Sequence, residues 1–343
     1  MLYVTTRNNR DAFTAQRALR ENRGPDGGLY VSFRAPHLSL ADIHALAEKP
    51  FNQCVAEVLN LLFNTRLTSW DVDFCVGRYP VRLETLRHRI IMAESWHNPD
   101  WNYARMVRSL VRHLRGDNGT AVPGDWAEIG IRIAVLFGVF GELMREGIVS
   151  ADNTVDISVV SGDFSAPMSA WYARQWGLPI GNIVCCCNEN NNLWDLICHG
   201  QLRTDSLSIP TSTPEADVSL PVDLERLIYA CGGITEVYRY LDCCRRGGMY
   251  CPNDAVLAKL RDGLFVSVAS SQRIETTIPS VYRTHSYLLS PYSALAYAGL
   301  LDYRTKAGES RHAIVLAEKS PVCDAETVAK ALGITTDELK RHI

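Results

Sequence analysis

The chain has 343 residues, of which 47% are hydrophobic and 21% are charged, a composition typical of a globular protein. Its formal net charge of -3 is close to neutral, and no dominant basic stripe is present. The most basic runs, Arg87–Arg89 and Arg108–Arg115, are spaced like the solvated face of a helix. Composition and charge therefore argue against a nucleic-acid-binding protein.

The sequence favours a cytoplasmic protein without a membrane span. Met1–Val4 runs directly into polar residues, so we expect no secretory signal. The longest apolar stretch, Ile129–Met144, contains Arg132 and Glu142, which predicts a buried helix rather than a bilayer-crossing one.

The eleven cysteines do not indicate a disulfide framework, because their number is odd and no secretory context accompanies them. They also form no paired zinc-like spacing, so we expect no metal site. Cys185–Cys187 lies in an apolar run from Ile183, which predicts a buried strand with structural thiols.

In chain order, the sequence patterns in the first third of the chain predict short strands separated by helices. Ser39 followed by Asp42 is typical of a helix start with a capping box. The other expected elements here are strands at residues 2–6, 29–31 and 90–92, and helices at 55–63, 72–76 and 103–114. A polar, glycine-containing segment, 116–126, follows and predicts a domain boundary.

Beyond this segment, strands and helices alternate, which favours a mainly parallel sheet in an α/β fold. We expect a break near Gly232 and Gly233 in the helix 223–240. The expected strands are 154–160, 182–187, 264–268 and 312–316, and the expected helices are 127–144, 168–175, 191–199, 223–240, 293–303, 324–332 and 336–343.

Several sequence blocks, in a shared order, resemble threonine synthase, a pyridoxal-phosphate enzyme of the tryptophan-synthase-β fold group. Each block is weakly specific alone, but together they cover both ends and the second half of the chain. They are Tyr3-Val4-Thr5-Thr6-Arg7, Asp26-Gly27-Gly28-Leu29-Tyr30-Val31, Ser161-Gly162-Asp163-Phe164, Gly177-Leu178-Pro179-Ile180, Asn188-Glu189-Asn190, Asp223-Leu224-Glu225-Arg226-Leu227-Ile228-Tyr229, Thr284-His285 and Ser320-Pro321.

The resemblance implies an α/β fold with a mainly parallel sheet of the threonine synthase and tryptophan synthase β type. It also implies a strongly reduced small domain, because the segment that normally carries several strand–helix units is short in this chain. The expected organisation is an N-terminal region at 1–115, a linker at 116–126 that replaces most of the small domain, and a large α/β domain at 127–343.

The cofactor lysine of the family is absent from its expected position. The family motif H-G-P-T-x-A-F-K-D corresponds here to residues 97–105, and Ala104 falls on the lysine. An alanine has no amine that could form an internal aldimine or act as a base. No lysine occurs between residues 50 and 258, and Lys319 is the one candidate for a relocated Schiff-base lysine.

Two further departures concern the cofactor cleft. Asp163 and Ser165 replace an amide side chain and a glycine in the turn that cradles the family's phosphate, and Glu318 replaces a threonine that faces the pyridine nitrogen. The resemblance thus places a degenerate phosphate turn and cleft at Ser161, Gly162, Phe164, Ser165 and Asn188. It leaves Asp163, Glu318 and His97 as candidate acids or bases.

Three functions remain open from the sequence. The first is a pseudoenzyme without cofactor that binds another copy, a complete enzyme, or a small amino-acid-like anion. The second is an enzyme with altered chemistry that acts on an amino-acid-derived substrate in the old cleft. The third retains pyridoxal phosphate non-covalently. An open, polar cleft would favour the enzyme, whereas a cleft filled by Trp96, Trp101 and Trp126 would favour the binding protein.

Overall fold

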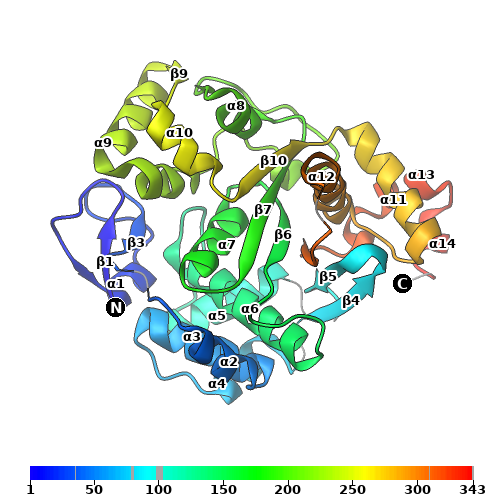
Figure 1. Cartoon of the computed structure of the whole chain (residues 1–343), viewed down its shortest axis with the longest axis horizontal. Helices are drawn as coiled ribbons and strands as arrows, with labels where there is room; N and C mark the ends of the chain where they lie inside the picture. Colours follow the sequence, from blue (N-terminus) through cyan, green and yellow to red (C-terminus); the bar gives the residue numbers. More distant parts are fainter. Residues whose placement is uncertain (35, 79–80, 98–102, 309, 342–343) are drawn as a thin grey trace.

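The computed structural model of the chain describes residues 1–34, 36–78, 81–97, 103–308 and 310–341, to which all structural statements refer (Figure 1). Most of the motif around the missing lysine, from Asn98 to Asn102 and including Trp101, lies outside these residues. His97, Tyr103 and Ala104, which flank it, are described.

The centre of the fold is a six-stranded sheet with the order β10-β7-β6-β11-β5-β4, in which β4 alone runs antiparallel to its neighbour. This confirms the α/β class and the mainly parallel sheet. Its strands are β4 (Arg82–Leu86), β5 (Ile90–Glu94), β6 (Val155–Val160), β7 (Ile180–Cys187), β10 (Leu264–Val268) and β11 (Ala313–Ala317).

Two small antiparallel sheets accompany the central one. The first lies near the N-terminus and the second joins two segments of the second half. Their strands are β1 (Leu2–Thr5), β2 (Phe13–Thr14) and β3 (Tyr30–Ser32) in the first sheet, and β8 (Leu202–Arg203) and β9 (Met249–Tyr250) in the second.

Helices cover both faces of the central sheet. They are α1 (Ala15–Arg20), α2 (Leu40–Ala47), α3 (Phe51–Phe63), α4 (Ser69–Val76), α5 (Tyr103–Arg115), α6 (Trp126–Arg145), α7 (Ser165–Gln175), α8 (Asn192–His199), α9 (Leu224–Arg246), α10 (Asp254–Arg261), α11 (Ser271–His285), α12 (Pro291–Ala307), α13 (Ala325–Leu332) and α14 (Thr336–Leu339). Short 3-10 turns occur at Arg87–Arg89, Pro214–Ala216 and Pro321–Asp324.

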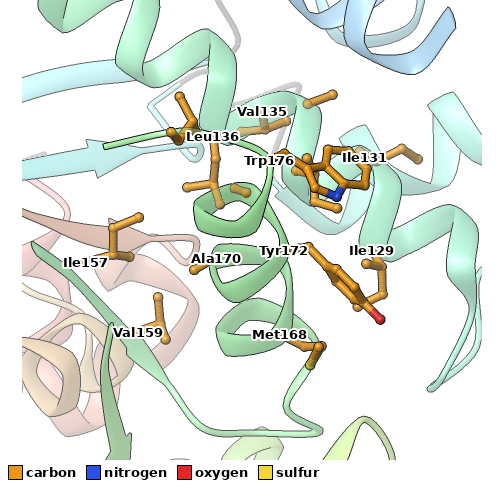
Figure 2. Close-up of a cluster of buried hydrophobic side chains, with 14 of the residues drawn as sticks. Ile129, Ile131, Val135, Leu136, Ile157, Val159, Met168, Ala170, Tyr172 and Trp176 are labelled. Carbon is orange, nitrogen blue, oxygen red and sulfur yellow. The ribbon is translucent and has the colours of Figure 1, made fainter. Parts of the chain in front are cut away.

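The strand side chains alternate between two hydrophobic cores, as the two-residue period of a strand requires. Ile91 of β5 packs in the core with α3, α6 and α7, whereas Ile90 and Met92 pack in the core with α11 and α12. Figure 2 shows part of the first core, with Ile157 of β6 on one side of α7 and Tyr172 on the other. Both faces of the sheet are therefore buried, which explains its apolar strands.

Local predictions from side-chain chemistry are confirmed. Ser39 and Asp42 form a capping box at the start of α2. Helix α9 is interrupted at Gly233, which has a left-handed φ of 69°. The three cysteines of β7 are buried, with Cys185 and Cys187 in one core and Cys186 in the other.

The predicted division of the chain into regions stays a prediction. Residues 116–125 join α5 to α6 without a helix or strand. The central sheet takes β4 and β5 from before this connection and its other four strands from after it. Within the described part of the chain, no helix has the length and apolar character that a bilayer crossing needs.

Candidate functional site

A cavity of about 680 Å³ opens beside the carboxyl ends of β6 and β11, where ligands bind in open α/β sheets. Its walls come from α5, the connection before α6, the first two turns of α6, the turn that leads from β6 into α7, and the residues that follow β11. The polar and charged lining residues include Arg108, Glu128, Arg132, Ser161, Asp163, Ser165, Glu215, Tyr292, Glu318 and Lys319.

The turn from β6 into α7 is built on two left-handed residues. Gly162 has a φ of 44° and Phe164 a φ of 71°, and the Phe164 side chain is buried in the core. Asp163 lies between them, and its Oδ1 accepts hydrogen bonds from the backbone N–H of Ser165 (2.9 Å) and from the Ser165 hydroxyl (2.6 Å). The Asp163 carboxylate therefore accepts the first N–H of α7, at the helix end that offers N–H groups to an anion.

A charged network on α6 forms another wall of the cavity. The Arg132 guanidinium donates to Oε1 of Glu128 at 3.1 Å and to Oε1 of Glu318 at 2.5 Å. It also lies 4.3 Å from the centre of the Tyr103 ring. Burial raises the pKa of Glu128, against the lowering by Arg132.

Lys319 is paired at the edge of the cavity. Its Nζ forms an ion pair with Glu215 and lies 4.2 Å from the centre of the Tyr292 ring. Burial lowers the pKa of Lys319, but the hydrogen bond to Glu215 and the interactions with Glu215 and Tyr292 together outweigh it, so the net shift is upward. The amine is thus held in its charged form.

The structure brings most of the predicted site residues together. Ser161, Gly162, Asp163, Ser165 and Glu318 all line the cavity. Ala104, at the position that the resemblance assigns to the lysine, lines it too.

Three predicted residues are not among those that line the cavity. His97 contacts the carbonyl oxygen of Glu94 through Nδ1 at 3.3 Å, and Phe164 is buried in the core. Asn188 is buried, and its amide donates to Thr211, Thr213 and Asp217. Their roles in a ligand site stay predictions.

Sequence reasoning did not identify Glu128 and Arg132 as site residues. They are separated by four positions and therefore lie on one face of α6, which is otherwise almost entirely buried. The available signal was the arginine within an apolar helix, since a charge in such a helix requires a partner.

Comparison with known proteins agrees with the resemblance. Residues 2–78 match the family model for the threonine synthase N terminus. Human threonine synthase-like 1 is 26% identical over 179 residues, which are 50% of this chain and 24% of that protein. Threonine synthase from Pseudomonas aeruginosa is 28% identical over 222 residues, which are 64% of this chain and 45% of that enzyme. The matched regions thus span 24% and 45% of these relatives, less than half of either.

Solved structures resemble the chain over nearly its whole length. Threonine synthase from Brucella melitensis, solved with bound pyridoxal phosphate, has a TM-score of 0.88 at 18% identity, covering 97% of this chain and 92% of that one. The yeast threonine synthase has a TM-score of 0.84 at 15% identity, covering 99% and 93%. The chain therefore resembles the threonine synthases in sequence over part of its length and has their fold.

Proposed function

We propose that this chain is a threonine synthase-like pseudoenzyme, which binds a small amino-acid-like molecule in the cavity and does not use a pyridoxal-phosphate Schiff base. The observation that carries the proposal is Ala104, which lines the cavity where the resemblance places the cofactor lysine. Pyridoxal-phosphate enzymes need that amine both to hold the cofactor and to move protons.

Lys319 is a poor replacement for the missing lysine. A Schiff base forms from a neutral amine, and the amine of Lys319 is stabilised in its charged form by Glu215. Among the described residues that line the cavity, Lys319 is the sole lysine.

The phosphate cradle is also altered. The Asp163 carboxylate already accepts the N–H of Ser165 at the start of α7, and a phosphate there would meet its negative charge. Glu318, which takes the place of the threonine at the pyridine nitrogen, accepts a hydrogen bond from Arg132 through Oε1. The residues present therefore do not fit the cofactor in the manner of the family.

A small molecule is favoured over a protein as the ligand of this cavity. The volume of about 680 Å³ lies in the range of small-molecule sites. The described residues that line the cavity include several charged side chains and no tryptophan. Trp126 is fully buried against Tyr3 and Tyr172 instead. Association with a second copy or with a complete enzyme is a separate proposal.

The second candidate is a cofactor-independent enzyme that acts on an amino-acid-derived substrate. The raised pKa of Glu128 favours it, because a buried carboxyl group with a raised pKa can act as a general acid or base. The charged side chains that converge on the cavity favour it as well. In this second candidate function, Glu318 is the ion-pair partner of Arg132.

The test is a visible-absorbance titration with pyridoxal phosphate, before and after borohydride reduction, on the native chain and on Lys319→Met and Ala104→Lys variants. We expect no reducible complex with the native chain. A reducible yellow complex that is lost in Lys319→Met would show that Lys319 has replaced the missing lysine, and it would overturn the proposal. The Ala104→Lys variant tests whether the altered cradle alone prevents cofactor binding.

A further inference from the structure

We propose, on the basis of the ligand-binding function above, that the cavity recognises its ligand through an organic ammonium group held between Asp163 and Glu128. The chain would then prefer amine cations to the anionic amino-acid-like ligands that its relationship to threonine synthase suggests. The argument rests on how the charges and hydrogen-bond donors of the cavity are already used.

The two carboxylates share a single hydroxyl group. The Ser165 hydroxyl lies 2.6 Å from Oδ1 of Asp163 and 3.5 Å from Oε1 of Glu128. A hydroxyl has one hydrogen to donate, and the shorter contact takes it. The hydroxyl therefore serves Asp163, while Oε1 of Glu128 accepts from Arg132, and repulsion between the two nearby carboxylates contributes to the raised pKa of Glu128.

Two of the three cations that line the cavity are already paired with carboxylates. Arg132 donates hydrogen bonds to both Glu128 and Glu318, and Lys319 forms an ion pair with Glu215. Within the described lining, the remaining cation is Arg108, whose side chain is exposed on α5. Carboxylates outnumber cations in this lining, so the addition of a positive charge is favourable and the addition of an anion is opposed.

A second observation points to a missing hydrogen-bond partner in the cavity wall. Tyr103 is only 7% exposed, lines the cavity, and carries a hydroxyl without a hydrogen-bond partner among the described residues. Burial raises the pKa of this phenol, so it stays neutral and keeps its acceptor capacity. A buried polar atom without a partner is costly, and a ligand N–H would satisfy it.

An ammonium group fits these acceptors better than a metal ion does. It has three hydrogen-bond donors and one positive charge. In the described part of the chain, no group of His, Cys, Asp and Glu side chains is arranged to hold a metal. Val107, Val159 and Leu316 supply apolar wall area, which suits the carbon chain of an aliphatic amine.

The experiment compares three ligands that share one carbon skeleton by isothermal titration calorimetry. Norleucine carries both charged groups, pentylamine carries the ammonium alone, and hexanoate carries the carboxylate alone. We expect norleucine and pentylamine to bind and hexanoate not to bind. Asp163→Asn and Glu128→Gln should each weaken pentylamine by about tenfold or more, because each removes a charged hydrogen-bond acceptor.

Charge-matched controls come from exposed positions. Glu146→Gln, at the far end of α6, and Asp152→Asn, in the turn before β6, remove the same charges away from the cavity and should leave affinity unchanged. Asparagine at 163 can still accept the Ser165 N–H, so this hydrogen bond at the start of α7 is retained. A thermal melt of each variant shows whether it folds.

The outcomes separate this inference from the proposed function. Hexanoate binding as tightly as pentylamine, or unchanged amine affinity in Asp163→Asn and Glu128→Gln, would overturn the ammonium preference and leave small-molecule binding intact. Failure of all three compounds to bind the folded native chain would overturn both.

Discussion

The Arg132 guanidinium of α6 lies 2.5 Å from a carboxylate oxygen of Glu318, the residue that follows β11. This pair connects the helix that forms one wall of the cavity to the end of a central strand. The pair also changes the role that we assign to Glu318, which from the sequence alone is an isolated candidate for acid–base chemistry. With Arg132 beside it, Glu318 is part of a fixed electrostatic wall.

Replacing Arg132 should therefore destabilise the fold. In Arg132→Met, Glu128 and Glu318 lose their shared cation, and both carboxylates are largely buried. We expect a loss of about 2 kcal/mol in the free energy of unfolding, less than the ~3–5 for a fully buried pair because Glu318 borders the water in the cavity. Urea denaturation at pH 7 measures it.

The matched control for this change is Glu318→Gln, which keeps a hydrogen-bond acceptor for Arg132 and leaves Glu128 in place as its partner. Its loss should be smaller than that of Arg132→Met. Equal stability of Arg132→Met and the native chain would show that the network is solvated and contributes nothing to the fold.

Buried Asp223 should make stability depend on pH. Burial raises its pKa to about 7, against the lowering by its partner Arg226, whereas an unfolded aspartate titrates near about 4. Between these values the folded state binds the proton more tightly than the unfolded state. The contribution of Asp223 to the free energy of unfolding therefore falls as pH rises from about 4 to about 7.

The variant Asp223→Asn should remove this contribution, because asparagine resembles the protonated carboxyl. Relative to the native chain, the variant should gain stability between pH 5 and pH 8, as measured by denaturation at both values. Parallel pH profiles for the two proteins would mean that Asp223 is ionised in the fold throughout this range.

The close packing of α12 on β7 gives a third prediction. A Cβ added to Gly299 would lie 2.2 Å from Sγ of Cys186, in a core without free space. Gly299→Ala should cost about 1–3 kcal/mol of unfolding free energy through overpacking, despite the better helix propensity of alanine. Gly141→Ala in α6 is the control, since its nearest neighbours lie at 3.4 Å.

A double-variant cycle identifies the cause. Cys186→Ala removes the clashing sulfur, so its effect and that of Gly299→Ala should not add, and the double variant should be more stable than the sum predicts. Simple additivity would show that the helix shifts and avoids the contact.

Much of the fold follows from local patterns in the sequence. The apolar run 183–187 predicts a strand because parallel strands are buried on both faces, and β7 is such a strand. Ser39 with Asp42, and Gly233, act through side-chain or backbone chemistry within a few residues. The resemblance to threonine synthase places Asp163 and Glu318 at one cleft, and both line the cavity.

Other structural features depend on contacts between residues that are distant in the sequence, which a local sequence pattern does not predict. The antiparallel edge strand β4 is half-exposed and charged, so it lacks the apolar signal of its neighbours. Helix α11 is polar and contains Pro279, which a sequence pattern treats as a helix breaker. The pairing of Arg132 with Glu318 joins residues 186 positions apart, and only the assembled sheet brings them together.

The cysteines provide the fourth prediction, since their burial should determine their reactivity. Cys251 and Cys323 are exposed, whereas Cys185, Cys186 and Cys187 are buried in β7. Burial raises the pKa of Cys186 to about 12, and the thiolate is the reactive form. In native protein treated with a disulfide reagent such as DTNB, we expect rapid labelling of Cys251 and Cys323 and none of the β7 thiols. All eleven should react in urea. Mass spectrometry of the labelled peptides assigns the sites, and rapid native labelling within β7 would mean that this part of the central sheet opens to solvent.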